Sequence, residues 1–185
     1  CLVGSEMCIR DRLQGEIMMT NLATALMMVL QTVVPSISKD RLNDVTVDMV
    51  AVVDEEYNAG SMNSTLTKGD ALAMLAAAVA HESGLQEEVE ACKKAGDGGK
   101  SVGLPQIMRG PNWEGHSRKE ICGNRKLQFK LALHVIDRAY ARTPRADALF
   151  RSYTSGDANI NSYAAKREYQ LFKMMKKSVD DLSLI

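Results

Sequence analysis

The chain has 185 residues, enough for one domain that buries a core without metals or disulfides to stabilise it. Aromatic residues make up only 5%, which argues against a nucleic-acid stacking surface, and the many Ala, Leu and Met residues favour helices. The net charge is zero, but residues 1–90 carry 5 Lys/Arg and 14 Asp/Glu whereas residues 91–185 carry 18 and 9. A basic second half fits an anionic partner, either cell-wall polymer or nucleic acid, and equally an ordinary solvated helix surface.

The first twelve residues, CLVGSEMCIRDR, show neither helical nor strand periodicity. They resemble a translated sequencing adapter, so we exclude them from the fold prediction; a genuine unstructured N-terminus is the alternative. Without them two cysteines remain, Cys92 and Cys122. These two could form a disulfide in an exported protein or be two reduced, buried thiols.

Helical spacing dominates the first half of the chain. The first predicted helix runs from about Asn21 to Val34 and ends at Pro35. It lacks a basic flank and a cleavage site, so we interpret it as an amphipathic helix and not as a signal peptide. No apolar run approaches the roughly 20 residues that a membrane span needs. A second helix is expected after Ser38, with Leu42, Val45, Met49, Val52 and Val53 on its apolar face.

A third helix is predicted between two local signals. Thr67 with Asp70 resembles a capping box, and Gly84 is a natural helix stop. The small residues between them are apolar on several faces, which predicts a central, closely packed helix. A polar loop, 58–64, precedes it, and a short acidic helix from about Gln86 to Cys92 is expected to follow.

The second half of the chain begins with a segment of different composition. The segment 95–107 has four glycines and a proline, which excludes a helix and indicates a tight hairpin. A long helix is predicted over Arg125–Arg142, then a helix ending near Tyr153 and a basic helix from about Ser162 to Lys177. On the long helix we expect one buried stripe, consisting of Leu127, Leu131, His134, Val135 and Arg138. The predicted fold class is α+β and mainly α, with a small β-hairpin beside the third helix.

Glu82 is the first residue that suggests chemistry. It falls in the last turn of the apolar third helix, where partial burial would raise the pKa of its carboxyl. A general acid needs such a raised pKa to stay protonated near neutral pH. The position of Glu82 alone does not indicate catalysis, because a glutamate that pairs with an ordinary neighbour at a helix end explains it more simply.

The segments around Glu82 resemble the lytic transglycosylase and goose-type lysozyme superfamily. Glu82, Ser83 and Gly84 are followed, about twenty residues later, by Gly103, Leu104, Gln106 and Ile107, and near the end of the domain Tyr153 to Gly156 partly match a Y-N-A-G motif. Pro105, Thr154 and Ser155 depart from the usual residues of these motifs. The resemblance covers roughly residues 67–177. It implies a lysozyme-like fold in which residues 61–178 form the catalytic domain, 13–60 are N-terminal helices and 179–185 are a tail.

The resemblance also implies roles for single residues. Glu82 would be the catalytic acid, and the substrate would be bound through Ser101, Gly103, Gln106 and Tyr153, with the Tyr153 hydroxyl donated to Glu82 or to substrate. Without the resemblance, turn capping explains Ser101, strand-end packing explains Gln106 and core filling explains Tyr153. Trp113 could stack on a sugar, although a single Trp is more often part of a core.

The role of Asp97 leaves two enzyme activities open. It suits an Asx turn, but goose-type lysozymes have a similar aspartate that is implicated in catalysis. With two carboxylates, Glu82 and Asp97, the chain would be a hydrolytic muramidase. With Glu82 alone it would be a lytic transglycosylase, in which the muramic acid 6-hydroxyl closes a 1,6-anhydro ring. We favour the transglycosylase; an inactive lysozyme-like module that binds glycan or is a virion structural part is a further alternative.

Other types of site are not supported by the sequence. Leu85 stands where a zinc protease motif that begins at His81 needs its second histidine, and the cysteines and histidines have no zinc-finger spacing. The segment GDGGKS lacks the spacing of a phosphate-binding loop. We therefore expect no metal and no cofactor. The expected partner is the peptidoglycan glycan strand and not nucleic acid, and the expected protein is a monomer that is periplasmic, extracellular or virion-associated.

Overall fold

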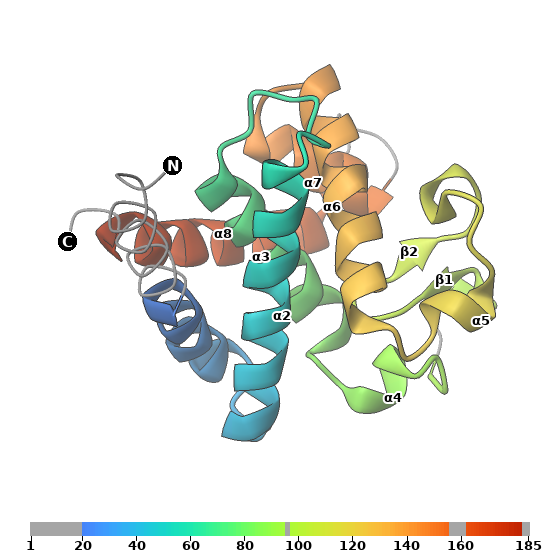
Figure 1. The fold of residues 1–185 in the computed structure, drawn as a ribbon, viewed down its shortest axis with the longest axis horizontal. Coiled ribbons are helices and arrows are strands. Elements are labelled where there is room, and N and C mark those ends of the chain that lie inside the picture. The colour runs from blue at the N-terminus through green and yellow to red at the C-terminus, as the bar shows by residue number, and fades with distance from the viewer. Residues whose placement is uncertain (1–19, 95–96, 156–161, 183–185) are drawn as a thin grey trace, which may run out of the picture.

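The computed structural model describes residues 20–94, 97–155 and 162–182. It is mainly helical with one small antiparallel sheet, which confirms the predicted fold class at this level (Figure 1). Residues 20–33 are helical, and none of the helices described is long and apolar enough to cross a membrane. The remaining elements are α2 (Lys39–Asn58), α3 (Lys68–Ser83), α4 (Glu87–Glu90), η1 (Asp97–Gly99), β1 (Ser101–Val102), β2 (Ile107–Met108), η2 (Pro111–Trp113), α5 (Arg118–Ile121), α6 (Arg125–Arg142), α7 (Ala146–Ser155) and α8 (Tyr163–Leu182).

Local capping signals fix the ends of α2 and α3 as the sequence predicts. The Ser38 hydroxyl accepts a hydrogen bond from the Arg41 amide at 3.3 Å, and the Thr67 hydroxyl accepts one from the Asp70 amide at 3.1 Å. Each bond satisfies an amide that the first helical turn would otherwise leave unpaired. α3 ends at Gly84, whose φ of 54° is left-handed. α4 is shorter than the predicted acidic helix, and α8 extends beyond the predicted end at Lys177.

The helix α3 lies at the centre of the molecule. Every residue from 71 to 80 is buried, and α3 packs against α2, α6 and α8 (Figure 1). The many alanines let these three helices approach closely, which confirms the predicted central helix. Because the flanks of α3 are covered, the helix reaches a partly open surface at its two ends, and Glu82 lies at the C-terminal one.

The buried face of α6 differs from the predicted stripe. Leu131 is buried as expected, but Leu127, His134 and Val135 are only partly buried and Arg138 is exposed. The prediction was wrong because α6 packs on two sides, against α2 and α3 and also against α5, β2, η2 and α7. Two polar residues therefore lie on the buried face. One of them, Asp137, accepts hydrogen bonds from the amides of Asn63 and Ser64, each at 2.9 Å.

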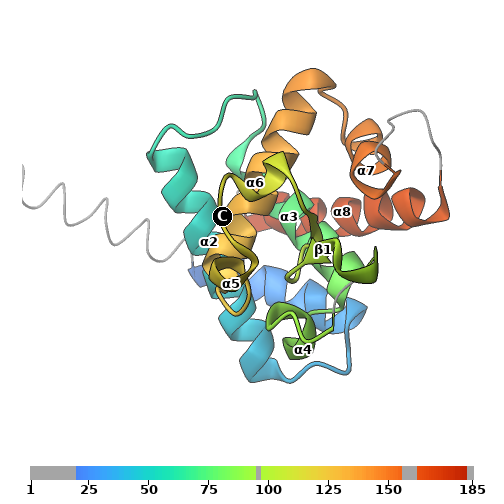
Figure 2. The same cartoon turned by 90° about the vertical axis from the view of Figure 1, so that its right-hand side faces the viewer.

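The segment from α4 to α5 is called the wing below. A disulfide closes it, and two ion pairs hold it against the helices. Figure 2 shows α4, β1 and α5 in front of the helices. Of the two alternatives for Cys92 and Cys122 the structure has the disulfide, with their Cα atoms 5.4 Å apart and a sequence separation of 30. A disulfide that closes a loop of this length contributes about 3 kcal/mol. Next to it, the mostly buried Glu90 carboxylate pairs with Arg41 of α2 at 2.8 Å and Arg125 of α6 at 3.0 Å.

Gln128 of α6 connects three parts of this wing from inside. Its side chain is fully buried, and its oxygen accepts a hydrogen bond from the Leu104 amide at 2.8 Å. Its nitrogen donates to the carbonyls of Glu90 and Ile121, each at 2.9 Å. The hairpin backbone passes so close that a Cβ on Gly103 would lie 2.6 Å from the Gln128 side chain, and Gly103 also has a φ of 74°. The position therefore needs glycine.

We expect Gln128→Met to destabilise the protein although it keeps the length of the side chain. The substitution leaves one amide and two carbonyls without their partner, and a buried unpaired group costs about 1–3 kcal/mol. Chemical denaturation should show a loss within or above that range. Gln170→Met, at an exposed position of α8, is the matched control and should be close to neutral. Equal stability of the two variants would contradict the role of Gln128.

Candidate functional site

Glu82 lines a cavity at the C-terminal end of α3. The cavity measures about 340 Å³, and Lys94 and Arg167 also line it. The helix end is fixed by Ser83, whose hydroxyl donates to the Val79 carbonyl at 2.9 Å and accepts from the Leu85 amide at 3.1 Å. Ser83 is buried and has a structural role in these bonds, so Glu82 is the ionisable residue of this predicted motif that lines the cavity.

The charges around this cavity are mostly positive. Arg167 comes from α8, Lys94 follows α4, and both line the cavity with Glu82 and His81. Burial lowers the pKa of His81, and the charge of Arg167 lowers it further. His81 is therefore mainly neutral at neutral pH, and the two longer side chains supply the positive charge. A cavity of this kind suits a neutral or anionic ligand.

The predicted hairpin is present and ends in a tight turn. Ser101 pairs with Met108 and Val102 with Ile107. In the turn, the backbone amide of Gln106 donates to the Gly103 carbonyl at 3.0 Å, and the side-chain amide of Gln106 donates to the same oxygen at 2.8 Å. Gln106 has a φ of 50°, which costs energy for any residue but glycine. The turn is held in one conformation.

Tyr153 connects α7 to this turn. Its hydroxyl donates to the Pro105 carbonyl at 2.7 Å and not to Glu82, and a contact with substrate stays a prediction. Burial raises the pKa of Tyr153 well above 10, and the charges of Glu168 and Glu82 raise it further. Tyr153 therefore stays protonated and keeps donating. It holds the turn and lies within the electrostatic influence of both acids.

Glu168 of α8 is an acidic residue of the site that the sequence reading did not single out. Its side chain is fully buried, and neither of its carboxyl oxygens has a hydrogen-bond partner among the residues that the structure describes. Burial raises its pKa well above 4.5, and the negative charge of Glu82 raises it further. The cost of burying an unpaired charge keeps such a carboxyl neutral.

The sequence did contain a signal for Glu168. The buried positions of α8 recur at helical spacing and include one charged residue among apolar ones: Ala165, Glu168, Leu171, Phe172, Met175 and Val179. A glutamate within an apolar stripe is costly to bury, so it warrants a functional explanation. In a helix with many lysines the stripe is easily overlooked, because the surrounding charges make Glu168 look like a surface residue.

The other predicted site residues have different settings. Ser101 is only 2% exposed, so a substrate contact would require its neighbours to move. The backbone of Asp97 begins η1, but its side chain lies outside the described part of the chain. Trp113 is buried, and its indole nitrogen donates to the Ile107 carbonyl at 3.1 Å, as a core residue that supports the hairpin. Tyr153 is the last described side chain of the predicted Y-T-S-G motif.

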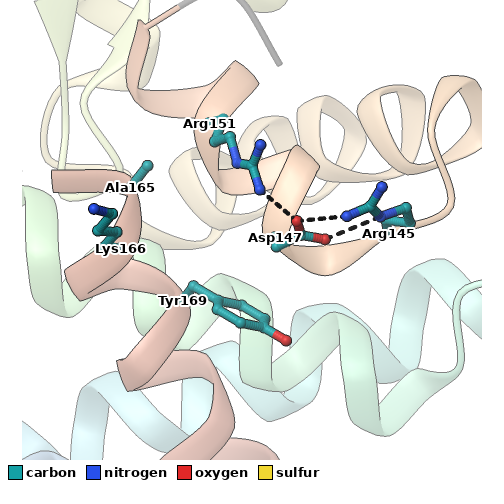
Figure 3. A pocket seen from close by; sticks show the side chains of 6 residues that line it. All are labelled: Arg145, Asp147, Arg151, Ala165, Lys166 and Tyr169. Carbon is teal, nitrogen blue, oxygen red and sulfur yellow. Dashed lines mark hydrogen bonds and ion pairs between the residues drawn. The ribbon is translucent and has the colours of Figure 1, made fainter. Parts of the chain in front are cut away.

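A second cavity, of about 410 Å³, lies between α7 and α8 and shares no lining residue with the first. Figure 3 shows Arg145 and Arg151 both directed at Asp147, with ion pairs of 2.8 and 2.6 Å. Lys166 and Tyr169 line the opposite side. The acid offsets part of the positive charge, and Glu82 does not reach this cavity, so we do not include it in the site.

Comparisons with protein-family models, with curated proteins and with solved structures found no match to this chain. Among the residues that the structure describes, no group of three or more His, Cys, Asp or Glu side chains is arranged to hold a metal ion.

We expect Glu168→Gln to stabilise the protein at neutral pH. Because the pKa of Glu168 is raised by folding, its contribution to stability is complete below about 4.5 and is lost as the pH rises towards the folded pKa. The variant should match the wild type near pH 4 and become increasingly more stable above it, as measured by urea denaturation at a series of pH values. Glu55→Gln, on an exposed side chain of α2, should show no such trend. A variant that is less stable than the wild type at pH 7 would argue against a buried, unpaired acid.

Proposed function

We propose that this protein cleaves peptidoglycan glycan strands between N-acetylmuramic acid and N-acetylglucosamine, as a lytic transglycosylase. Glu82 is the catalytic acid, and no metal or cofactor takes part. The substrate is held along the cavity at the end of α3 and the neighbouring hairpin turn. The proposal includes a lysozyme-like arrangement of the domain, for which the mainly helical fold with one small hairpin is a necessary condition.

The observation that carries this proposal is the convergence of three sequence-distant segments. Glu82 ends the central helix, the turn 103–106 is tied to Tyr153 through Pro105, and Tyr153 interacts electrostatically with Glu82. The turn is thus bonded to Tyr153, and the charge of Glu82 contributes to the raised pKa of the Tyr153 hydroxyl, which supports the proposal. A coincidental sequence match would give no reason for these links.

In the proposed reaction Glu82 acts twice. Its carboxyl first donates a proton to the glycosidic oxygen, so that the N-acetylglucosamine side leaves as an alcohol and positive charge develops at C1 of muramic acid. The 6-hydroxyl of the same muramic acid then attacks C1 and gives its proton to the Glu82 carboxylate. The net products are one free 4-hydroxyl and one 1,6-anhydro end, and Glu82 regains its proton. The positive charges of Lys94 and Arg167 suit the lactyl carboxylate or peptide carboxylates of the wall.

Two further observations support an enzyme of the cell envelope. A disulfide between Cys92 and Cys122 is typical of proteins in oxidising compartments, so a periplasmic, extracellular or virion-associated location is part of the proposal. The buried, unpaired Glu168 beside Glu82 is expensive to keep. Such costs are commonly retained at working sites, which favours an active enzyme over an inactive glycan-binding or virion structural module.

We expect Glu82→Gln to abolish wall lysis without lowering the melting temperature. The amide keeps the shape of the side chain but has no transferable proton, and loss of general acid–base catalysis typically costs about 10²–10⁴-fold in rate. A turbidity assay on purified cell walls measures the effect, and Glu55→Gln is the control that should lyse normally. Normal lysis by Glu82→Gln would exclude the proposed role of this residue.

Asp97→Asn distinguishes the transglycosylase from the hydrolytic muramidase. In a transglycosylase Asp97 shapes the turn before β1, and asparagine supports the same turn chemistry, so most activity should remain. In a muramidase the substitution removes the base that activates water, with a loss of about 10²–10⁴-fold. A reducing-sugar assay accompanies the rate measurement, because only hydrolysis creates new reducing ends. A large loss together with reducing-end products from the wild type would establish the muramidase instead.

A further inference from the structure

The cavity beside Glu82 has an apolar wall as well as charged residues. Its volume of about 340 Å³ is in the usual range for a small-ligand site. The apolar residues of its lining come from four segments of the chain and are Val33, Val34, Ala80, Val89 and Leu171. Lys94 and Arg167 line the same cavity. A ligand that matches this lining has both an apolar surface and a negative charge.

Val34 belongs to a segment that the sequence resemblance leaves outside the expected catalytic domain, yet it lies next to the end of α3. The helix before it is anchored in the core by Leu26 and Leu30, which are fully buried. The Val34 amide donates to the Leu30 carbonyl at 2.8 Å. A Cβ on Gly84 would lie 4.0 Å from a methyl carbon of Val34, and Gly84 is two residues after Glu82. The N-terminal helix therefore supplies one wall of the candidate site.

Both kinds of surface are held in place at this cavity. Val33 and Val34 are only partly buried, so they keep apolar surface that a ligand can cover, and covering it is favourable because water is released. The Lys94 ammonium group donates to the side-chain oxygen of Gln86 at 3.2 Å, and Gln86 is another lining residue. This bond keeps the positive charge of Lys94 at the cavity.

We propose that this cavity binds the peptide stem of peptidoglycan and that Val33 and Val34 determine a specificity for muramic acid that carries a peptide. This inference rests on the proposed function, which places muramic acid beside Glu82. The stem is a short peptide on the lactyl group, with methyl groups that suit the valines and carboxylates that suit Lys94 and Arg167. A glycan strand without its peptides offers the lactyl group but no further apolar surface.

Binding of two small probes tests the site without any cleavage. N-acetylmuramic acid and N-acetylmuramyl-L-alanyl-D-isoglutamine each carry a single carboxylate, so the difference between their affinities measures the effect of the peptide. Both are titrated into nitrogen-15-labelled wild-type protein and followed by NMR. The peptide-bearing probe should bind about tenfold more tightly, because each apolar carbon that leaves water adds about fourfold in affinity. Equal affinity for the two probes, or no binding of the peptide-bearing one, would overturn the proposal.

Variants of the two walls assign the binding to this cavity. Val34→Ser should weaken the peptide-bearing probe about fourfold or more and leave N-acetylmuramic acid unchanged. Val47→Ser, at a valine of α2 that is 49% exposed and lies outside the cavity lining, is the matched control. Lys94→Gln should also weaken the peptide-bearing probe, whereas Lys93→Gln, at the exposed neighbour, should not. Lys94 is exposed, so its variant decides the question even if Val34→Ser does not fold. Equal losses in a variant and its control would contradict the site.

Cleavage assays separate this inference from the proposed function. Soluble glycan strands that keep their peptides should be cleaved with a lower KM than strands from which an amidase has removed them, and Val34→Ser should narrow that difference. Equal KM for the two substrates would overturn the inference and leave the proposed function in place. Failure of the wild type to cleave either substrate would refute the proposed function, and the probe titrations would then decide on the cavity alone.

Discussion

The hydrogen bonds of the Gln128 side chain join the wing to the helices, and the geometry of the candidate site depends on them. The side-chain amide of this α6 residue bonds to the backbone of Leu104 in the hairpin, of Glu90 in α4 and of Ile121 in α5. The carbonyl of the next hairpin residue, Pro105, accepts a hydrogen bond from the Tyr153 hydroxyl. Through this chain of contacts a single buried amide fixes the hairpin relative to the acids at the end of α3.

The acidic residues of the wing and of the candidate site differ in their partners. Ion pairs on the wing are satisfied, because Glu90 is bound by two arginines. For Glu168 of α8 the opposite holds, since its carboxyl is buried without a hydrogen bond to any described residue and its pKa is raised by burial and by the charge of Glu82. A fold gains no stability from such an arrangement. A carboxyl with a raised pKa warrants a functional explanation, because perturbed pKa values are common at functional sites.

Much of this arrangement was accessible from the sequence where the determinants are local. The caps at Ser38 and Thr67 and the stop at Gly84 set helix ends through neighbouring residues. The sequence left open whether Cys92 and Cys122 form a bridge, which the structure contains. What depends on tertiary packing could not be predicted. The buried face of α6 includes Gln128 because its partners come from three distant segments. The Tyr153 hydroxyl bonds to a carbonyl 48 residues away, which no spacing rule specifies.

The central claim is that the cavity beside Glu82 cleaves glycan strands by intramolecular attack of the muramic acid 6-hydroxyl. Mass analysis of the fragments that the wild-type protein releases from purified peptidoglycan tests it most directly. We expect muropeptides with 1,6-anhydro ends, which are lighter by one water than the corresponding hydrolysis products. Release of reducing-end muropeptides alone would contradict the transglycosylase mechanism, and release of no glycan fragment at all would contradict the assignment of this protein to glycan cleavage.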